Sequence, residues 1–242
     1  MSVLYVVPTP IGNLGDISVR ALETLSSVDF IVAEDTRVSV KLLTHFSIKK
    51  PLVSYHEHNK AFRGTEIVAR ILAGESCAIV TDAGTPAISD PGTELARDCI
   101  TAGIRVIPLP GPCAAVCALS VSGISAGRFC FEGFLSVSKK SRREHLEMLK
   151  NEPRSMVFYE APHKLKATLK DMLDAFGDRE ITLARELTKI YEEFIKTTLS
   201  NALSFYENTE PRGEYVLIVS PKPHIEDAPP PEFDLSGSSK DS

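Results

Sequence analysis

A chain of 242 residues, of which 43% are hydrophobic and 24% are charged, is long enough for one large or two small globular domains and too apolar to be disordered throughout. Its formal net charge of −5 argues at first against nucleic acid as a partner. The last segment, 224–242, holds five acidic residues against one lysine, so residues 1–223 are close to neutral and leave room for a local basic surface.

The cysteines and the first residues indicate the compartment. The five cysteines lie mostly in apolar stretches, with no CxxC pair and no histidine spacing typical of zinc, so we predict buried thiols and no metal. The apolar stretch at the start ends at Pro8, which is too short for a signal peptide or a membrane span. We therefore expect a cytoplasmic protein with no membrane partner.

Apolar runs alternate with helical periodicity along the first half of the chain. Strands are predicted at 3–7, 28–33, 77–81 and 104–109. Helices are predicted after Asp16, which is expected to cap the first of them, and at 64–73 and 94–102. This β–α alternation indicates a mostly parallel sheet covered on both faces.

The second half repeats the alternation of strands and helices. Strands are predicted near 129–134, 156–159, 180–186, 192–196 and 215–220, and helices near 141–150, 163–176 and 199–206. We therefore predict an α/β fold of two α/β domains, residues 1–116 and 117–223, with a cleft between them. The proline-rich acidic segment 224–242 is predicted to be a disordered tail.

Segment 81–92, TDAGTPAISDPG, is the most informative part of the sequence. Small, turn-forming residues at the end of a strand place backbone groups at the edge of a sheet where α/β folds bind ligands. Gly84 and Gly92 allow the backbone to approach a ligand, and Asp82 and Asp90 can cap amides or face a cation. For any single residue a purely structural turn is an equal alternative, but the low bulk of the whole segment favours a ligand site.

Eight motifs in order resemble one family. They are PTPIGNLGD (8–16), AEDTR (33–37), TDAGTPAISDPG (81–92), PLPGPCAA (108–115), FEGFL (131–135), FYEAPHK (158–164), ARELTK (184–189) and GEYVLIV (213–219). Together they resemble the bacterial 16S rRNA cytidine 2′-O-methyltransferases, a branch of the tetrapyrrole methylase-like enzymes. The resemblance covers about residues 3–221.

The resemblance implies S-adenosylmethionine in the cleft between two α/β domains, usually within a homodimer, and methylation of the ribose of a decoding-centre cytidine. The cofactor residues that it implies, together with Asp82 and Gly84 of the turn segment, are Ile11, Thr85, Ile88, Cys113, Ala114, Tyr159, Glu160, Ala184, Arg185, Glu214 and Tyr215. The chain departs from the family pattern at Cys113, where serine is usual, and at Ser136, where proline is usual. Many members also carry a C-terminal extension that the acidic tail does not resemble, which affects the expected RNA contacts.

Methyl transfer to a hydroxyl requires the two reacting groups to be held in line, and a proton acceptor near the hydroxyl helps. The catalytic candidates are Glu34 and Asp35 of AEDTR, and Glu186 and Lys189 of ARELTK, with Lys189 as a neutral base if it is desolvated. Equally, Glu34, Asp35 and Arg37 can form a structural ion-pair network. Glu186 and Lys189 can belong to a solvated charged edge.

The densest basic cluster is predicted to bind RNA. It contains Lys139, Lys140, Arg142 and Arg143 near the start of a predicted helix, where cations oppose the helix dipole unless an anion is present. Arg37 is predicted to extend this surface around the cleft. A solvated helix end is the alternative explanation for any one of these residues.

Three functions remain open at this point. The leading one is methylation of 16S rRNA, with the 30S ribosomal subunit as partner. The alternatives are a methyltransferase for a small tetrapyrrole-type molecule, which the shared fold favours, and a protein that binds a nucleoside-like ligand or the ribosome without turnover.

Overall fold

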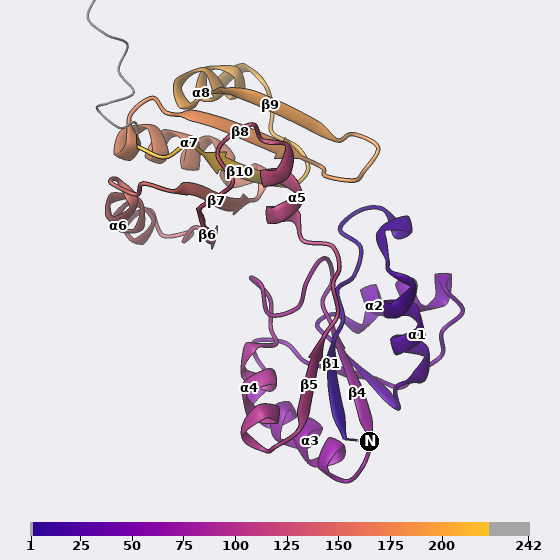
Figure 1. Cartoon of the computed structure of the whole chain (residues 1–242). Helices are drawn as coiled ribbons and strands as arrows, with labels where there is room; N and C mark the ends of the chain where they lie inside the picture. The colour runs from indigo at the N-terminus through magenta and orange to yellow at the C-terminus, as the bar shows by residue number, and fades with distance from the viewer. Residues whose placement is uncertain (1, 223–242) are drawn as a thin grey trace, which may run out of the picture.

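The computed structural model describes residues 2–222, and the predicted tail at 224–242 lies outside the described residues. The first half of the chain builds one sheet and the second half builds another, each with helices packed against it (Figure 1). The prediction of two α/β units is therefore confirmed.

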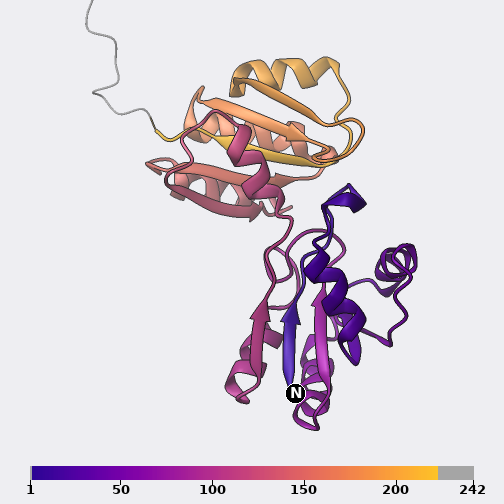
Figure 2. The same ribbon diagram turned by 45° about the vertical axis from the view of Figure 1, so that its right-hand side comes forward.

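The first sheet has five parallel strands in the order β3-β2-β4-β1-β5. These strands are β1 (Val3–Val6), β2 (Phe30–Ala33), β3 (Leu52–Ser54), β4 (Ser76–Val80) and β5 (Arg105–Pro108). Strands β2 and β4 are continuous apolar runs because they are buried on both faces, as is usual in parallel sheets. The carboxyl ends of these strands lie at one edge, which faces the second domain (Figure 2).

Two helices cover each face of this sheet. Helices α1 (Val19–Ser27) and α2 (Thr36–His45) pack on one face, where Leu25 and Leu43 join its core. Helices α3 (Lys60–Leu72) and α4 (Thr93–Thr101) pack on the other through Ile67 and Leu95. The chain therefore wraps both faces and leaves the carboxyl edge open for loops.

The start of α1 differs from the prediction. Residues Leu14–Asp16 form a short 3-10 helix, whose N-cap Asn13 accepts a hydrogen bond from the Gly15 amide. Ser18 caps α1 by accepting a hydrogen bond from the Ala21 amide. The prediction that Asp16 caps this helix is therefore wrong, because the chain makes an additional turn before α1 begins.

The second sheet is mixed, in the order β6-β7-β10-β8-β9, with β6 and β7 parallel and the remaining neighbours antiparallel. Its strands are β6 (Phe129–Phe134), β7 (Ser155–Glu160), β8 (Glu180–Arg185), β9 (Glu193–Thr198) and β10 (Tyr215–Val219). The buried strand β10 lies at its centre and begins near the first domain.

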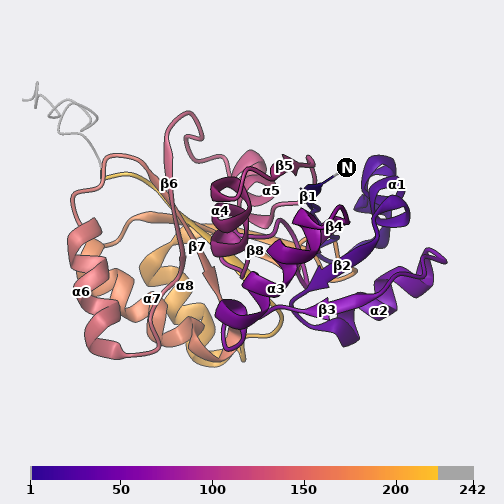
Figure 3. The same ribbon diagram turned by 90° about the horizontal axis from the view of Figure 1, so that it is seen from below.

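Helices α6 (Lys139–Leu149), α7 (Pro162–Phe176) and α8 (Leu199–Asn208) pack on one face of the second sheet. Helix α5 (Ala114–Val121) packs on the other face, against Val157 and Val216. Residues 114–116, which the predicted boundary assigns to the first domain, thus begin a helix that packs on the second sheet; the division at 116 and 117 stays a prediction. From below, α6 and α2 lie at opposite ends of the molecule (Figure 3).

Within residues 2–222, no helix has both the length and the apolarity to cross a membrane.

Candidate functional site

The loops after three strands of the first sheet, β1, β4 and β5, meet at its carboxyl edge. The loop after β1 pairs with the loop after β4, since the Thr9 amide donates to the Gly84 carbonyl at 2.9 Å and the Gly84 amide donates to the Thr9 carbonyl at 3.1 Å. Thr85 Oγ1 donates to the carbonyl of Pro112, in the loop after β5, at 2.9 Å. Hydrogen bonds between loops therefore fix this edge.

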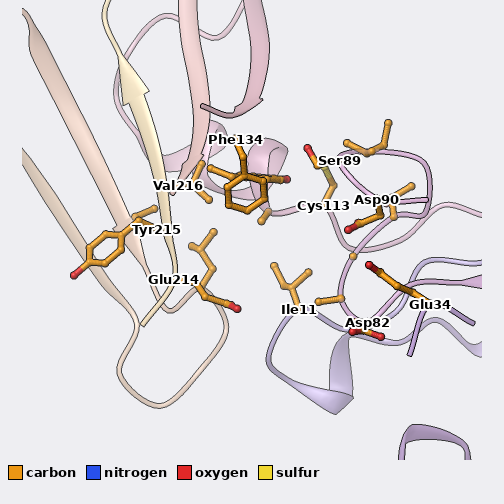
Figure 4. Close-up of a pocket in the computed structure, with 18 residues that line it drawn as sticks. Ile11, Glu34, Asp82, Ser89, Asp90, Cys113, Phe134, Glu214, Tyr215 and Val216 are labelled. Atoms are coloured by element: carbon orange, nitrogen blue, oxygen red, sulfur yellow. The ribbon is translucent and has the colours of Figure 1, made fainter. Parts of the chain in front are cut away.

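The second domain closes a cavity over these loops. The cavity has a volume of about 290 Å³ and lies between the loops of the first domain and the strands β7, β8 and β10. In Figure 4, Phe134, Tyr215 and Val216 lie on one side of it and Ser89, Asp90 and Asp82 on the other. Its lining residues are Ile11, Glu34, Asp82, Ala83, Gly84, Thr85, Ile88, Ser89, Asp90, Cys113, Ala114, Phe134, Tyr159, Ala184, Leu187, Glu214, Tyr215 and Val216. We call this space the first cavity.

The turn segment after β4 has a constrained backbone. Gly84 has a φ of +85°, and Ala87 and Ser89 have φ of +68° and +67°. Non-glycine residues rarely adopt this left-handed conformation, and where they do it is held in place by surrounding structure, often at functional sites. The two turns direct Thr85, Ser89 and Asp90 toward the first cavity.

Four acidic residues line the first cavity, Glu214 from the second domain and Glu34, Asp82 and Asp90 from the first. Burial raises the pKa of Asp90 to about 6, with a further contribution from the negative charges of Glu34 and Asp82. Burial also raises the pKa of Asp82, and the charges of Glu34 and Asp35 act in the same direction. Thr81 Oγ1 donates to Glu34 Oε2 at 2.8 Å and orients that carboxylate. This wall is therefore suited to a cationic group.

The structure brings together most of the residues predicted to bind the cofactor. The first cavity is lined by Ile11, Asp82, Gly84, Thr85, Ile88, Cys113, Ala114, Tyr159, Ala184, Glu214 and Tyr215. Tyr159 also accepts a hydrogen bond at its hydroxyl from the Ala115 amide, at 3.1 Å, which ties β7 to the start of α5.

Glu160 and Arg185 are not among the residues that line the first cavity. The Glu160 carboxylate is buried and accepts hydrogen bonds from the amide of Ala161, the N-cap of α7, and from Thr168 within that helix. Arg185 donates to the Arg212 carbonyl and pairs with Glu193 at 2.8 Å. Both side chains hold the second domain together.

The predicted catalytic residues separate into different environments. Glu34 lines the first cavity. Asp35 is the N-cap of α2 and pairs with Arg37 at 2.6 Å, and these hydrogen bonds lower its pKa to about 2. Asp35 thus matches the structural ion pair that the sequence left open as an alternative.

Lys189 lies between two carboxylates, which oppose the neutral form that the prediction of a base requires. Its Nζ donates to Glu186 Oε1 and to Glu214 Oε2, each at 2.9 Å. Burial acts to lower the pKa of Lys189, but these two carboxylates outweigh it and raise the pKa above its ordinary value. Glu186 also accepts from the Glu214 amide at 2.9 Å, so it anchors the loop after β8 to the start of β10.

The predicted basic cluster on α6 is largely neutralised. Arg142 is buried, and its guanidinium pairs with the buried carboxylate of Asp171 at 2.6 Å. Arg143 pairs with Asp171 at 2.7 Å and with Asp174 at 3.1 Å. The prediction that Arg142 contacts RNA is wrong, because its side chain attaches α6 to α7. Lys139 and Lys140 are exposed, as is Arg37 on α2.

Some lining residues were absent from the predicted set, among them Ser89, Asp90, Phe134, Leu187 and Val216. Ser89 and Asp90 belong to the turn segment that the sequence singled out, but their proximity to Glu34 depends on how β2 and β4 pair. Phe134 ends β6 and contacts Tyr159 edge to face at 5.4 Å between ring centroids. No local pattern in the sequence indicates that contact.

The fold and the cavity between the two sheets define the class of protein. Residues 3–203 match the family described as Tetrapyrrole (Corrin/Porphyrin) Methylases. The same architecture occurs in a diphthine synthase, at 15% identity and a TM-score of 0.71 over 91% of this chain and 90% of that one. It also occurs in a uroporphyrin-III-C-methyltransferase from Thermus thermophilus, at 18% identity and a TM-score of 0.64 over 91% and 94%. The chain belongs to the tetrapyrrole methylase family.

Within that class, the chain is similar to curated proteins named Ribosomal RNA small subunit methyltransferase I. It is 50% identical to the one from Synechocystis over 91% of this chain and 79% of that protein. It is 51% identical to the one from Bacillus subtilis over 90% and 75%. The one from Thermotoga maritima is 48% identical over 92% of this chain and is matched over 100% of its own length.

Proposed function

We propose that this protein transfers a methyl group from S-adenosylmethionine to the ribose 2′-hydroxyl of a decoding-centre cytidine in 16S rRNA, with the 30S subunit as substrate. The observation that carries this proposal is the set of relatives at about half identity whose name is that of a small-subunit ribosomal RNA methyltransferase. Its support in the structure is a cavity between the two domains that is suited to a nucleoside-like cationic ligand.

The residues of the first cavity fit the cofactor. S-adenosylmethionine carries a sulfonium and an ammonium, which suit the wall formed by Glu34, Asp82 and Asp90. Its adenosine part needs an apolar surface, which Ala184 and Val216 supply from the second domain. Gly84 lines the cavity with a φ of +85°, a conformation that glycine adopts without strain, so this turn suits a glycine.

When bound, the cofactor supplies an activated methyl group. The protein's own contribution is orientation, because an in-line displacement is accelerated when the reacting groups are held in near-attack geometry. Glu34, Asp82 and Asp90 offer carboxylates that can accept a hydrogen bond or a proton from the acceptor hydroxyl.

We also propose that the protein acts as a homodimer in the cytoplasm, where a ribosomal substrate is found. Helix α5 is apolar on nearly all sides, and a helix of that kind is usually buried on all sides. One side packs on the second sheet, yet Val116 and Val121 are 56% and 53% exposed. A second copy covering this side would bury them.

The test uses purified protein, methyl-labelled S-adenosylmethionine and 30S subunits that lack the modification. Digestion of the 16S rRNA to nucleosides is expected to yield labelled 2′-O-methylcytidine. Label in a different nucleoside would contradict the proposed acceptor. Label in a tetrapyrrole and none in RNA would contradict the proposed substrate class.

A pair of glycine variants separates the site from the scaffold. Gly84→Ala places an alanine at a φ of +85° in the wall of the first cavity. Gly103→Ala places an alanine at a φ of +74° after α4, where the added Cβ would have no other atom within 4 Å. Each costs about 1–2 kcal/mol of backbone strain. We expect only Gly84→Ala to weaken cofactor binding by calorimetry and to reduce labelling at saturating RNA. An equal loss of cofactor affinity in both variants would show that the turn segment does not belong to the site.

A further inference from the structure

A second cavity, of about 460 Å³, adjoins the first on the side of α2. The two share a common wall of Ile11, Asp82, Ala83 and Glu214, and the second extends to α2 and Lys189. Pockets of about 300–1,000 Å³ hold compact organic ligands, so a single nucleotide fits this size class. A ligand there would lie directly against a ligand in the first cavity.

The lining of the second cavity combines an apolar side with two ammonium groups. Val38 and Leu42, on consecutive turns of α2, provide apolar surface of the kind that packs on a base or ribose. Lys189 is held by Glu186 and Glu214, which fixes its position and offsets its charge. Lys41 forms no ion pair with any other residue in 2–222, so its charge is available to a ligand.

Basic side chains continue along helix α2, away from the cavity. Arg37, Lys41 and His45 are spaced four residues apart and lie along one exposed face of the helix, which we call the α2 stripe. No acidic residue occurs in the sequence between Asp35 and Glu57. Arg37 pairs with Asp35, but its side chain is still 88% exposed. The α6 cluster, by contrast, has lost Arg142 and Arg143 to Asp171.

We propose that single-stranded RNA runs along the α2 stripe with its phosphates on Arg37 and Lys41, and places the acceptor nucleotide in the second cavity with its hydroxyl against Asp82. The inference rests on the proposed function and names the surface that receives the substrate. RNA is the occupant that the observations favour, because exposed basic side chains, among them Lys41 with no ion pair in residues 2–222, lead to a nucleotide-sized cavity. An acceptor nucleotide in this cavity would be turned out of the strand, and sequence-specific RNA recognition commonly uses single-stranded bases that are splayed out in this way.

The test compares double variants of the full-length protein for methylation of unmodified 30S subunits. Arg37→Gln with Lys41→Gln is expected to raise KM about tenfold, and to reduce the slope of log affinity against log salt by about 1.5, as expected for two lost phosphate contacts. Cofactor affinity, measured by calorimetry, stays unchanged and reports that the protein is folded. Lys41→Arg, which keeps the charge, is expected to retain the KM of the wild type.

Two further variants provide the controls. Arg97→Gln with Arg105→Gln removes two exposed cations on α4 and β5 and is expected to alter neither KM nor the salt slope. Val38→Trp fills the second cavity and is expected to reduce kcat/KM for the subunit while leaving cofactor affinity unchanged.

The inference is overturned if the α2 variant behaves like the Arg97 and Arg105 control. It is also overturned if Lys139→Gln with Lys140→Gln has the larger effect on KM, or if Val38→Trp leaves methylation unchanged. Failure of the proposed function is a separate result, since the wild-type protein would then transfer no label to 16S rRNA.

Discussion

Asp90 gives the first cavity a carboxyl group whose charge changes close to neutral pH. Its pKa of about 6 in the folded chain, raised by burial and by Glu34, exceeds the value of about 3.9 in an unfolded chain. The folded state therefore holds the proton more tightly, so this group contributes stability below about pH 4 that is lost as the pH rises through about 6. A cation bound beside the ionised Asp90 carboxylate would offset this loss of stability.

We expect Asp90→Asn to be more stable than the wild type at pH 7 in the absence of ligand, by about 2–4 °C in the unfolding midpoint for each kcal/mol recovered. Its midpoint relative to the wild type should rise between about pH 4 and 6 and be constant above. Its cofactor affinity should fall, because the carboxylate that faces the cation is gone. Thermal unfolding across this pH range and calorimetry measure the two effects, and parallel pH curves for variant and wild type would contradict the assignment.

Single residues also show where sequence reasoning reaches its limit. The turn segment could be located from its composition, because glycine, proline and aspartate at the end of a strand have local causes. The partner of Arg142 could not be predicted in this way, since its ion pair with Asp171 joins two helices that are far apart in the sequence. The protonation of Lys189 likewise depends on Glu214, which β10 brings alongside.

At the scale of elements, most strands and helices with a clear period were predicted, but helix α2, which is as amphipathic as α7, was not. Sequence patterns located β6 at its observed bounds and α7 to within a residue. They missed α2, the short strand β3 and α5. Helix α5 has apolar residues on nearly all sides, so no period distinguishes its buried side, and β3 has only three residues.

The uncovered side of α5 supports a prediction about assembly. Val116→Asp places a charge on this side, where burial against a second copy would be costly. We expect the molar mass from light scattering to fall from that of a dimer to that of a monomer. Val19→Asp, on α1 at a residue 72% exposed, is the matched control and should leave the mass unchanged. A wild-type protein that is already monomeric would contradict the proposed dimer.

At the scale of the whole molecule, the first cavity exists because two domains hold a fixed relation to each other. The loop after β1 reaches the loop after β8, where an added Cβ on Gly12 would lie 2.5 Å from Lys189 Cγ and 2.9 Å from the Leu187 carbonyl oxygen. On the other side of the cavity, a Cβ on Gly133 would lie 3.0 Å from Ser89 Oγ. Both glycines allow the domains to approach closely, and each contributes to an edge of the site.

Gly12→Ala therefore tests whether domain spacing sets ligand affinity. The Lys189 side chain can move aside, but the Leu187 carbonyl belongs to the backbone, so the two loops must separate by a fraction of an ångström. Such overpacking costs about 1–3 kcal/mol, and because Ile11 and Leu187, which line the first cavity, lie on the two separated loops, we expect much of it to appear as weaker cofactor binding. Gly127→Ala, with nothing within 4 Å, is the control. Calorimetry measures cofactor affinity and denaturant unfolding measures stability. A loss of stability with full cofactor affinity would mean that the contact supports the fold alone. Weaker binding with a small loss of stability would mean that the domain spacing shapes the site.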